Sequence, residues 1–161
     1  MNEHERFMMK AIEAAHESGH RSDYPIGTVI VKDGEIISSG YETLKSANDP
    51  VNGHAEIDAI RKATREILKQ PYLEGCTLYS THEPCPMCAT AAFWSKIKTI
   101  VFSVSREDMI EQMPKRASGK FSWRQVDISC KDVLDHGSGH MVELIPSVLR
   151  EEGIKLFDYT A

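Results

Sequence analysis

Two short motifs carry the residues best suited to chemistry. His54 and Glu56 are separated by one residue, and Cys85 and Cys88 follow further along the chain as a C-x-x-C pair. Side chains three residues apart share one face of a helical turn, so the two sulfurs should point the same way. Two thiolates and an imidazole together suit Zn²⁺. The spacing therefore predicts a zinc site with His54, Cys85 and Cys88 as its ligands.

Three protein ligands leave one zinc position open, which is typical of a catalytic site rather than a structural one. The open position would hold water, whose pKa zinc lowers to roughly 7. Glu56 lies close to His54 without being needed as a ligand. It can move protons as a general acid and base, an effect worth about 10²–10⁴-fold. We expect Glu56 to be the catalytic residue.

A structural zinc site is the alternative, and it would need a fourth ligand. His82, just before the cysteine motif, is the obvious candidate. In that case the chain would be a zinc-stabilised binding module without turnover. Cys76 and Cys130 are instead expected to be small buried residues in strands.

The elements that must position these residues follow from hydrophobic periodicity and turn signals. Asp33 and Gly34 form a strong two-residue hairpin turn, and Pro86 suits the first position of a helix. The expected elements are a helix over 3–18, hairpin strands over 27–31 and 35–40, a loop over 41–53, a helix from about 54, a strand over 76–81, a helix over 86–95, a strand over 99–104, a short helix and loop within 106–123, a strand over 126–130, and a helix over 139–152 that Pro146 kinks or divides.

Strands that alternate with helices predict an α/β sandwich around a mixed five-stranded sheet. The first hairpin should be antiparallel, and the later strand–helix–strand units parallel with right-handed crossovers. We expect a single domain over residues 1–161, with 139–161 as a C-terminal helix and tail.

Composition narrows the possible partners. The 161 residues carry a formal net charge of −5, which argues against a broad nucleic-acid surface because such surfaces depend on Lys and Arg. No apolar run approaches the ~20 residues of a membrane helix. The N-terminus lacks the basic and apolar stretches of a signal peptide. We therefore expect a cytoplasmic protein with reduced thiols.

Four stretches of the sequence resemble the cytidine deaminase superfamily, and within it the branch of guanine deaminases and tRNA adenosine deaminases. They are residues 24–31, 48–50, 54–61 and 83–88, and the H-x-E and P-C-x-x-C motifs are a signature of zinc deaminases. The resemblance covers about residues 1–105. It implies a three-layer α/β/α fold, a zinc-bound water, Glu56 as proton shuttle, and a homodimer or larger oligomer.

The resemblance leads us to expect hydrolytic deamination of a free, guanine-like base. Phe93 and Trp94 are similar to an aromatic pair of guanine deaminases, although core packing explains them equally well. Relatives commonly carry an Asn where this chain has Glu42 or Thr43, and an ionised Glu only accepts hydrogen bonds. Amino-purines, pterins and triazines therefore stay open as substrates. The expected substrate contacts are Glu42, Thr43, Ala55, Pro25, Glu83 and Trp94.

Two other activities remain as alternatives within the superfamily. A tRNA adenosine deaminase would bind an anticodon stem-loop in a salt-dependent way. A cytidine deaminase is disfavoured by the Pro86-Met87 form of the cysteine motif. The aromatic and acidic tail over 157–159 could close the pocket or pack on the core.

Overall fold

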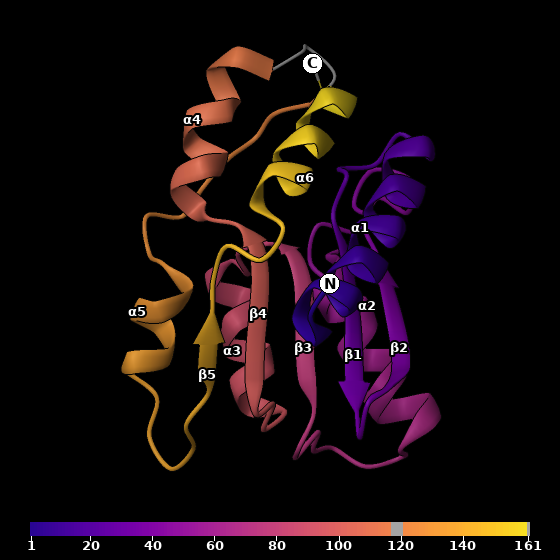
Figure 1. Ribbon diagram of the computed structural model, residues 1–161, viewed down its shortest axis with the longest axis vertical. Helices are drawn as coiled ribbons and strands as arrows, with labels where there is room; N and C mark the ends of the chain where they lie inside the picture. The colour runs from indigo at the N-terminus through magenta and orange to yellow at the C-terminus, as the bar shows by residue number, and fades with distance from the viewer. Residues whose placement is uncertain (117–120, 161) are drawn as a thin grey trace.

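A mixed five-stranded sheet forms the centre of the computed structural model, which describes residues 1–116 and 121–160 (Figure 1). The strand order is β2-β1-β3-β4-β5. β1 runs antiparallel to both β2 and β3, whereas β4 runs parallel to β3 and β5. The strands are β1 Gly27–Lys32, β2 Glu35–Tyr41, β3 Thr77–His82, β4 Thr99–Val104 and β5 Glu143–Ile145. The expected mixed sheet, antiparallel hairpin and parallel β3–β4 unit are confirmed.

Helices cover both faces of the sheet and make it the middle of three layers. The helices are α1 Glu3–His20, α2 Ala55–Arg61 continued by a π-helical turn over Lys62–Ile67, α3 Pro86–Trp94, α4 Arg106–Arg116, α5 Cys130–Asp135, and α6 Arg150–Lys155 continued by a 3₁₀ turn over Leu156–Thr160. α1 lies on one face, and α2 and α3 lie on the other (Figure 1). No described helix is both long enough and apolar enough to cross a membrane.

The strand residues alternate between two hydrophobic cores, as the period of two in a strand requires. Val29 and Tyr79 pack with Met8 on the α1 side. Ile30 and Leu78 pack on the opposite side with the apolar residues of α2 and α3. This division confirms the α/β/α sandwich.

Local signals explain the elements that were correctly expected. Asn2 and Glu5 form a capping box at the start of α1, which satisfies amides that the first helical turn leaves unpaired. Asp33 and Gly34 both have positive φ, 50° and 79°, as a tight two-residue hairpin turn requires. Pro86 begins α3 directly after Cys85.

The expected strand over 126–130 and helix over 139–152 are wrong. Cys130 begins the helix α5, and the fifth strand is β5, which pairs with β4. The strand is only three residues long, and its partner lies more than forty positions away, so its local pattern could not reveal it. Pro146 follows the strand directly, and a helix resumes only at Arg150. The loop expected after α4 crosses residues 117–120, which lie outside the described residues.

Gly40 sets how closely β2 approaches α2. A Cβ at Gly40 would lie 1.9 Å from the Ala55 carbonyl oxygen and 2.7 Å from the Ala59 nitrogen. Because α2 begins one residue after His54, this contact also determines where the imidazole lies.

We expect Gly40→Ala to destabilise the protein, because β2 and α2 must separate to accept the methyl group. Overpacking of this kind costs about 1–3 kcal/mol. Denaturant unfolding measures the loss, with the neighbouring Ser39→Ala as a matched control that should change the unfolding free energy by less than about 0.5 kcal/mol. Equal stability of the two variants would show that β2 and α2 can accept the methyl group without loss of stability.

Candidate active site

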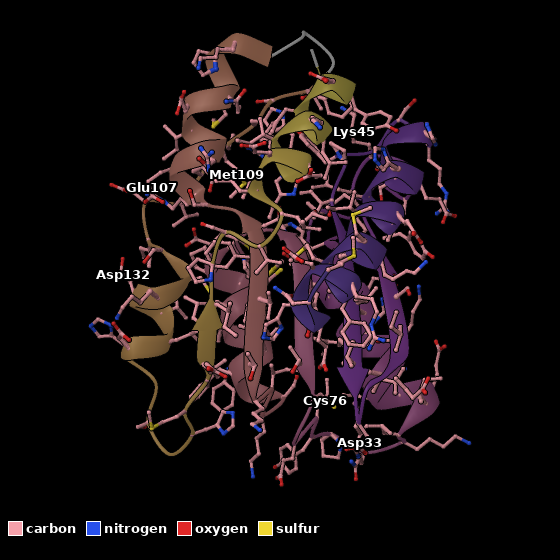
Figure 2. All side chains as sticks on the ribbon, viewed as in Figure 1. Asp33, Lys45, Cys76, Glu107, Met109 and Asp132 are labelled. Carbon is pink, nitrogen blue, oxygen red and sulfur yellow. The ribbon has the colours of Figure 1, made fainter. Side chains whose placement is uncertain are left out.

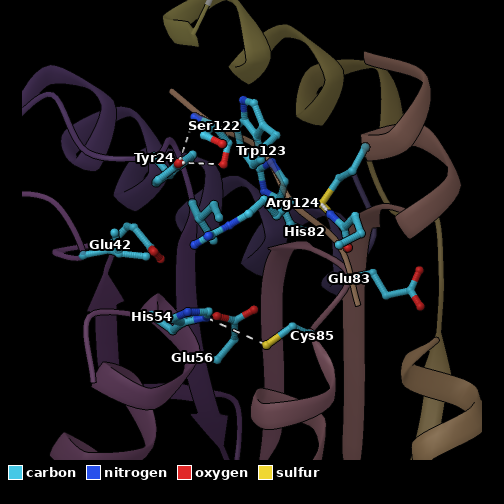
Figure 3. A pocket seen from close by; sticks show the side chains of 14 residues that line it. Tyr24, Glu42, His54, Glu56, His82, Glu83, Cys85, Ser122, Trp123 and Arg124 are labelled. Atoms are coloured by element: carbon cyan, nitrogen blue, oxygen red, sulfur yellow. Dashed lines mark hydrogen bonds between the residues drawn. The ribbon is translucent and has the colours of Figure 1, made fainter. Parts of the chain in front are cut away.

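A cluster of three potential metal ligands lies where α2 and α3 begin. His54 directly precedes α2, Cys85 directly precedes α3, and Cys88 lies in its first turn. Their ligand atoms all lie within 4.8 Å of one another. His54 Nδ1 is 3.8 Å from Cys85 Sγ (Figure 3). It is 3.6 Å from Cys88 Sγ.

The geometry of this cluster fits one tetrahedral zinc ion. Zinc binds sulfur at about 2.3 Å and imidazole nitrogen at about 2.0 Å, so two such ligands lie roughly 3.6 Å apart at the tetrahedral angle. The two S–N distances, 3.6 and 3.8 Å, agree with that value. Within residues 1–116 and 121–160, no fourth His, Cys, Asp or Glu joins the group. The donor set is therefore that of a site with one position open to a small molecule.

Within the cluster, the surroundings of Cys85 favour the thiolate form that zinc requires. A hydrogen bond with Cys88 lowers the pKa of Cys85 to about 4 against the effect of burial, with a further contribution from His54. The hydrogen bond with Cys85 raises the pKa of His54 to about 9. The pKa of Cys88 is raised by the same pairing with Cys85 and by burial.

Glu56 lies beside the cluster in the first turn of α2 and is only 4% exposed. Its Oε1 accepts a hydrogen bond from Ser80 Oγ on β3 at 3.1 Å. Burial raises the pKa of Glu56, and the charge of Cys85 raises it further. A carboxyl group with a raised pKa can both take and release a proton near neutral pH.

A cavity of about 190 Å³ opens directly above the cluster and Glu56 (Figure 3). Met109 and Lys45 mark this end of the molecule, while Asp33 and Cys76 lie at the opposite end (Figure 2). The cavity is lined by Tyr24, Ile26, Glu42, Leu44, His54, Glu56, His82, Glu83, Cys85, Met109, Ser122, Trp123, Arg124 and Gln125.

Glu42 lines this cavity from the end of β2 and is 2% exposed. Its Oε2 accepts a hydrogen bond from the backbone nitrogen of Ala55 at 3.0 Å. Burial raises the pKa of Glu42 to about 8. The carboxyl group therefore orients the start of α2 and faces the pocket at once.

Glu83 also lines the cavity, but both of its oxygens are engaged elsewhere. Oε2 accepts from the Arg106 nitrogen at 2.6 Å, and Oε1 accepts from the Cys130 nitrogen at 2.9 Å. Figure 3 shows the carboxylate turned away from His54 and Glu56. Glu83 thus holds the starts of two helices in place, and its expected role as a substrate contact stays a prediction.

The other expected substrate contacts are not brought to the cavity. Trp94, at the end of α3, is 71% exposed because the helix carries it away from the pocket end at Cys85. Ala55 is fully buried and contributes its backbone nitrogen to Glu42. Pro25 and Thr43 are outside the lining set, although Tyr24 and Ile26 on either side of Pro25 belong to it.

The segment over 121–125 forms a pocket wall that the sequence did not reveal. Tyr24 Oη donates to the Ser122 carbonyl oxygen and accepts from the Ser122 nitrogen. Trp123 Nε1 donates to Thr160 Oγ1 at 3.0 Å, which ties the segment to the C-terminal turn. The segment has neither periodicity nor a motif, so only its two aromatic residues, Phe121 and Trp123, hinted at a buried position.

His82 lies at the end of β3 and is 2% exposed, outside the metal cluster. Its ring is nearly parallel to Trp123, at 13° and 5.8 Å between centroids, and meets Phe157 edge-on at 5.3 Å. The alternative of a fourth zinc ligand is therefore wrong. Burial lowers the pKa of His82 to about 3, so the imidazole stays neutral.

This burial predicts that acid destabilises the protein through His82. The unfolded chain takes up a proton near pH 6.5 and the folded chain only near pH 3, so the folded state loses stability as pH falls through that window. The free energy of unfolding falls by about 1.4 kcal/mol for each pH unit below 6.5, so the total loss at pH 5 is about 2 kcal/mol. Denaturant unfolding of the wild type and His82→Gln, both with zinc, should differ by this slope. Parallel pH profiles would contradict the prediction.

Comparison with known proteins places this site in a family. Residues 1–104 match the model of the cytidine and deoxycytidylate deaminase zinc-binding region. A guanine deaminase of Bacillus subtilis is 40% identical over 109 residues, which are 67% of this chain and 69% of that protein. A tRNA-specific adenosine deaminase of Aquifex aeolicus is 42% identical over 99 residues, 62% of this chain and 64% of that protein.

A solved structure agrees with this assignment over nearly the whole chain. It comes from a study of tRNA deaminases that edit the wobble position of transfer RNA, and it superposes with a TM-score of 0.74 at 28% identity, covering 94% of this chain and 98% of that one. The sequence match covers the cluster, Glu56 and four strands, and the structural match extends the likeness to the C-terminal third. The chain belongs to the family defined by the cytidine and deoxycytidylate deaminase zinc-binding region.

Proposed function

We propose that this protein is a zinc-dependent aminohydrolase that removes an exocyclic amine from a free, guanine-like heterocycle. His54, Cys85 and Cys88 would hold the zinc ion, and Glu56 would move the protons. The observation that carries the proposal is the three-ligand cluster with a buried carboxyl group beside it, on the floor of one cavity.

Zinc, when bound, supplies a Lewis acid that makes water nucleophilic at neutral pH. Glu56 takes a proton from the attacking water and delivers it to the ring nitrogen beside the reacting carbon. It then takes the second proton to the leaving amine, so that a C–O bond replaces the C–N bond and ammonia departs. Ser80 holds one oxygen of Glu56, which leaves the other oxygen for these transfers.

A free base fits the polar groups around the cavity. Glu42 and Glu56 place two buried carboxyl groups on its walls, whereas the Glu83 carboxylate is held by the Arg106 and Cys130 nitrogens. Burial raises the pKa of Glu42 and of Glu56, so they act as hydrogen-bonding groups rather than fixed charges and suit a neutral ring with N–H donors. The guanine deaminase relative supports the same ring class.

Deamination of adenosine in tRNA is the second candidate. The tRNA-specific relative is as similar as the guanine deaminase, at 42% and 40% identity respectively. Arg124 is exposed at the pocket wall, where it could meet a phosphate.

An ammonia-release screen with the zinc-loaded protein tests these proposals. It includes guanine, adenine, cytosine, their nucleosides, pterins, triazines and an anticodon stem-loop, with the exposed Glu66→Gln as a matched control for Glu56→Ala. Release from guanine that needs Glu56 supports the proposal. Release only from the stem-loop, with binding that weakens as salt rises, favours the tRNA candidate. Bound zinc without any release indicates a binding module.

We also propose that the protein acts as a homodimer in the cytoplasm. The exposed Trp94 ring on α3 supports a protein contact there, since large apolar groups are enriched at interfaces. The four unpaired cysteines suit a reducing compartment. Light scattering of the wild type and Trp94→Arg tests the assembly, and a monomeric wild type would contradict it.

A further inference from the structure

We propose that His82 determines substrate specificity by donating an Nε2–H hydrogen bond to an acceptor atom of the ring. The acceptor would be a carbonyl oxygen or an unprotonated ring nitrogen. This inference rests on the proposed function, because it concerns the substrate of the same cavity.

The first observation is an unsatisfied atom in the cavity wall. His82 lines the cavity, yet its Nε2 is buried without a hydrogen-bond partner among the described residues. Buried polar groups in proteins are nearly always paired, so an orphan atom beside a pocket calls for a partner. A ligand bound in the cavity would supply that partner.

The second observation assigns the hydrogen to Nε2. Thr81 Oγ1 lies 2.8 Å from His82 Nδ1 and also accepts a hydrogen bond from the Gly27 nitrogen at 3.2 Å. Thr81 is fully buried, so its hydroxyl hydrogen needs an acceptor within the protein. Nδ1 is that acceptor, which leaves the hydrogen of the neutral imidazole on Nε2. His82, a residue of the cavity wall, therefore carries a donor that no described residue uses.

The third observation is that the ring is held in place before any ligand arrives. Trp123 stacks on His82 and Phe157 packs against it edge-on. Nε2 is covered, so a substrate atom must displace a neighbouring side chain to reach it. Arg124 lines the same cavity, is exposed, and forms no hydrogen bond or ion pair with the described residues.

Together with Glu42, this donor makes the cavity offer two different hydrogen-bonding groups to a ring. Glu42 offers a carboxyl group from the end of β2, and His82 offers an N–H from the end of β3. A ring with an N–H on one edge and an acceptor on the other, as in an amino-oxo heterocycle such as guanine, matches both. A ring that carries an amine in place of the oxygen would set two donors against each other.

The test compares three rings in the wild type, His82→Leu and His82→Gln. Guanine has both candidate acceptors, 2,6-diaminopurine replaces the carbonyl with an amine, and 7-deazaguanine replaces the ring nitrogen with carbon. We expect His82→Leu to lower kcat/KM for guanine about 10- to 100-fold, and to have little effect on the ring that lacks the acceptor. His82→Gln, which retains an N–H, should restore part of the loss. The exposed His136→Leu is the control, and zinc content and Tm confirm that each variant folds.

An equal loss on all three rings would overturn the inference while leaving the deaminase proposal intact. If the wild type releases no ammonia from any base, the proposed function fails. The role of His82 is then tested by calorimetry, which compares the binding of the three rings to Glu56→Ala with and without His82→Leu. The role of His82 would be refuted if both proteins showed the same preference among the three rings, or if neither bound any of them. Nitrogen-15 spectra provide an independent check, because a hydrogen on Nδ1 instead of Nε2 would contradict the assigned donor.

Discussion

Glu56→Ala should abolish deamination while leaving zinc bound. Glu56 is a carboxyl group that is buried beside the cluster and held by a hydrogen bond from Ser80. General acid–base catalysis contributes about 10²–10⁴-fold, so we expect kcat to fall by at least that factor. His54, Cys85 and Cys88 retain their positions in the variant, so zinc content should be unchanged.

The Glu56→Gln variant separates the loss of proton transfer from the loss of the side chain. The amide keeps the size of the side chain and its contact with Ser80, but it cannot carry a proton between two atoms. We therefore expect Glu56→Gln to be as inactive as Glu56→Ala, with substrate binding closer to that of the wild type. Steady-state kinetics and metal analysis measure both quantities. A kcat within a few-fold of the wild type would remove Glu56 from the mechanism.

The sequence predicted the N-terminal two thirds of the fold because its signals are local. The capping residue Asn2, the Asp33-Gly34 turn and Pro86 each specify the backbone of their own neighbourhood. The C-terminal third depends on distant partners instead. β5 is a strand because β4 offers it backbone hydrogen bonds, and no property of residues 143–145 alone requires that pairing.

The site divides in the same way. The three metal ligands and Glu56 lie within two motifs, so the spacing of the motifs was sufficient to predict that they meet. The pocket walls come from segments that meet only in three dimensions. Trp123 packs on His82, which lies 41 positions earlier in the chain. Glu83 accepts hydrogen bonds from the backbone nitrogens of Arg106 and Cys130, and no motif encodes these contacts.

Glu42 lies between these two cases. Its position after β2 predicted a place near the pocket, and the structure puts it there. Its hydrogen bond to the Ala55 nitrogen could not be foreseen, because it depends on the path of the loop over residues 43–53. This bond links the pocket wall to the start of α2, directly after His54.

Cys88→Ala should remove zinc and activity together. Cys88 is 1% exposed and its Sγ is 3.6 Å from His54 Nδ1, so no other described side chain can replace it without a change of backbone. A bound ion stabilises the folded state in proportion to its affinity, so the variant should also lose the rise in Tm that zinc produces in the wild type.

Cys76→Ala is the matched control for this loss. Cys76 is fully buried like Cys88 but lies at the opposite end of the molecule, outside the cluster (Figure 2). Its removal should lower stability by the usual cost of a small cavity and leave zinc content unchanged. Metal analysis and thermal unfolding with and without a chelator compare the two variants. If Cys88→Ala retained its zinc, or if both variants lost it equally, the cluster would not be the binding site, because only one of the two thiols lies within reach of His54.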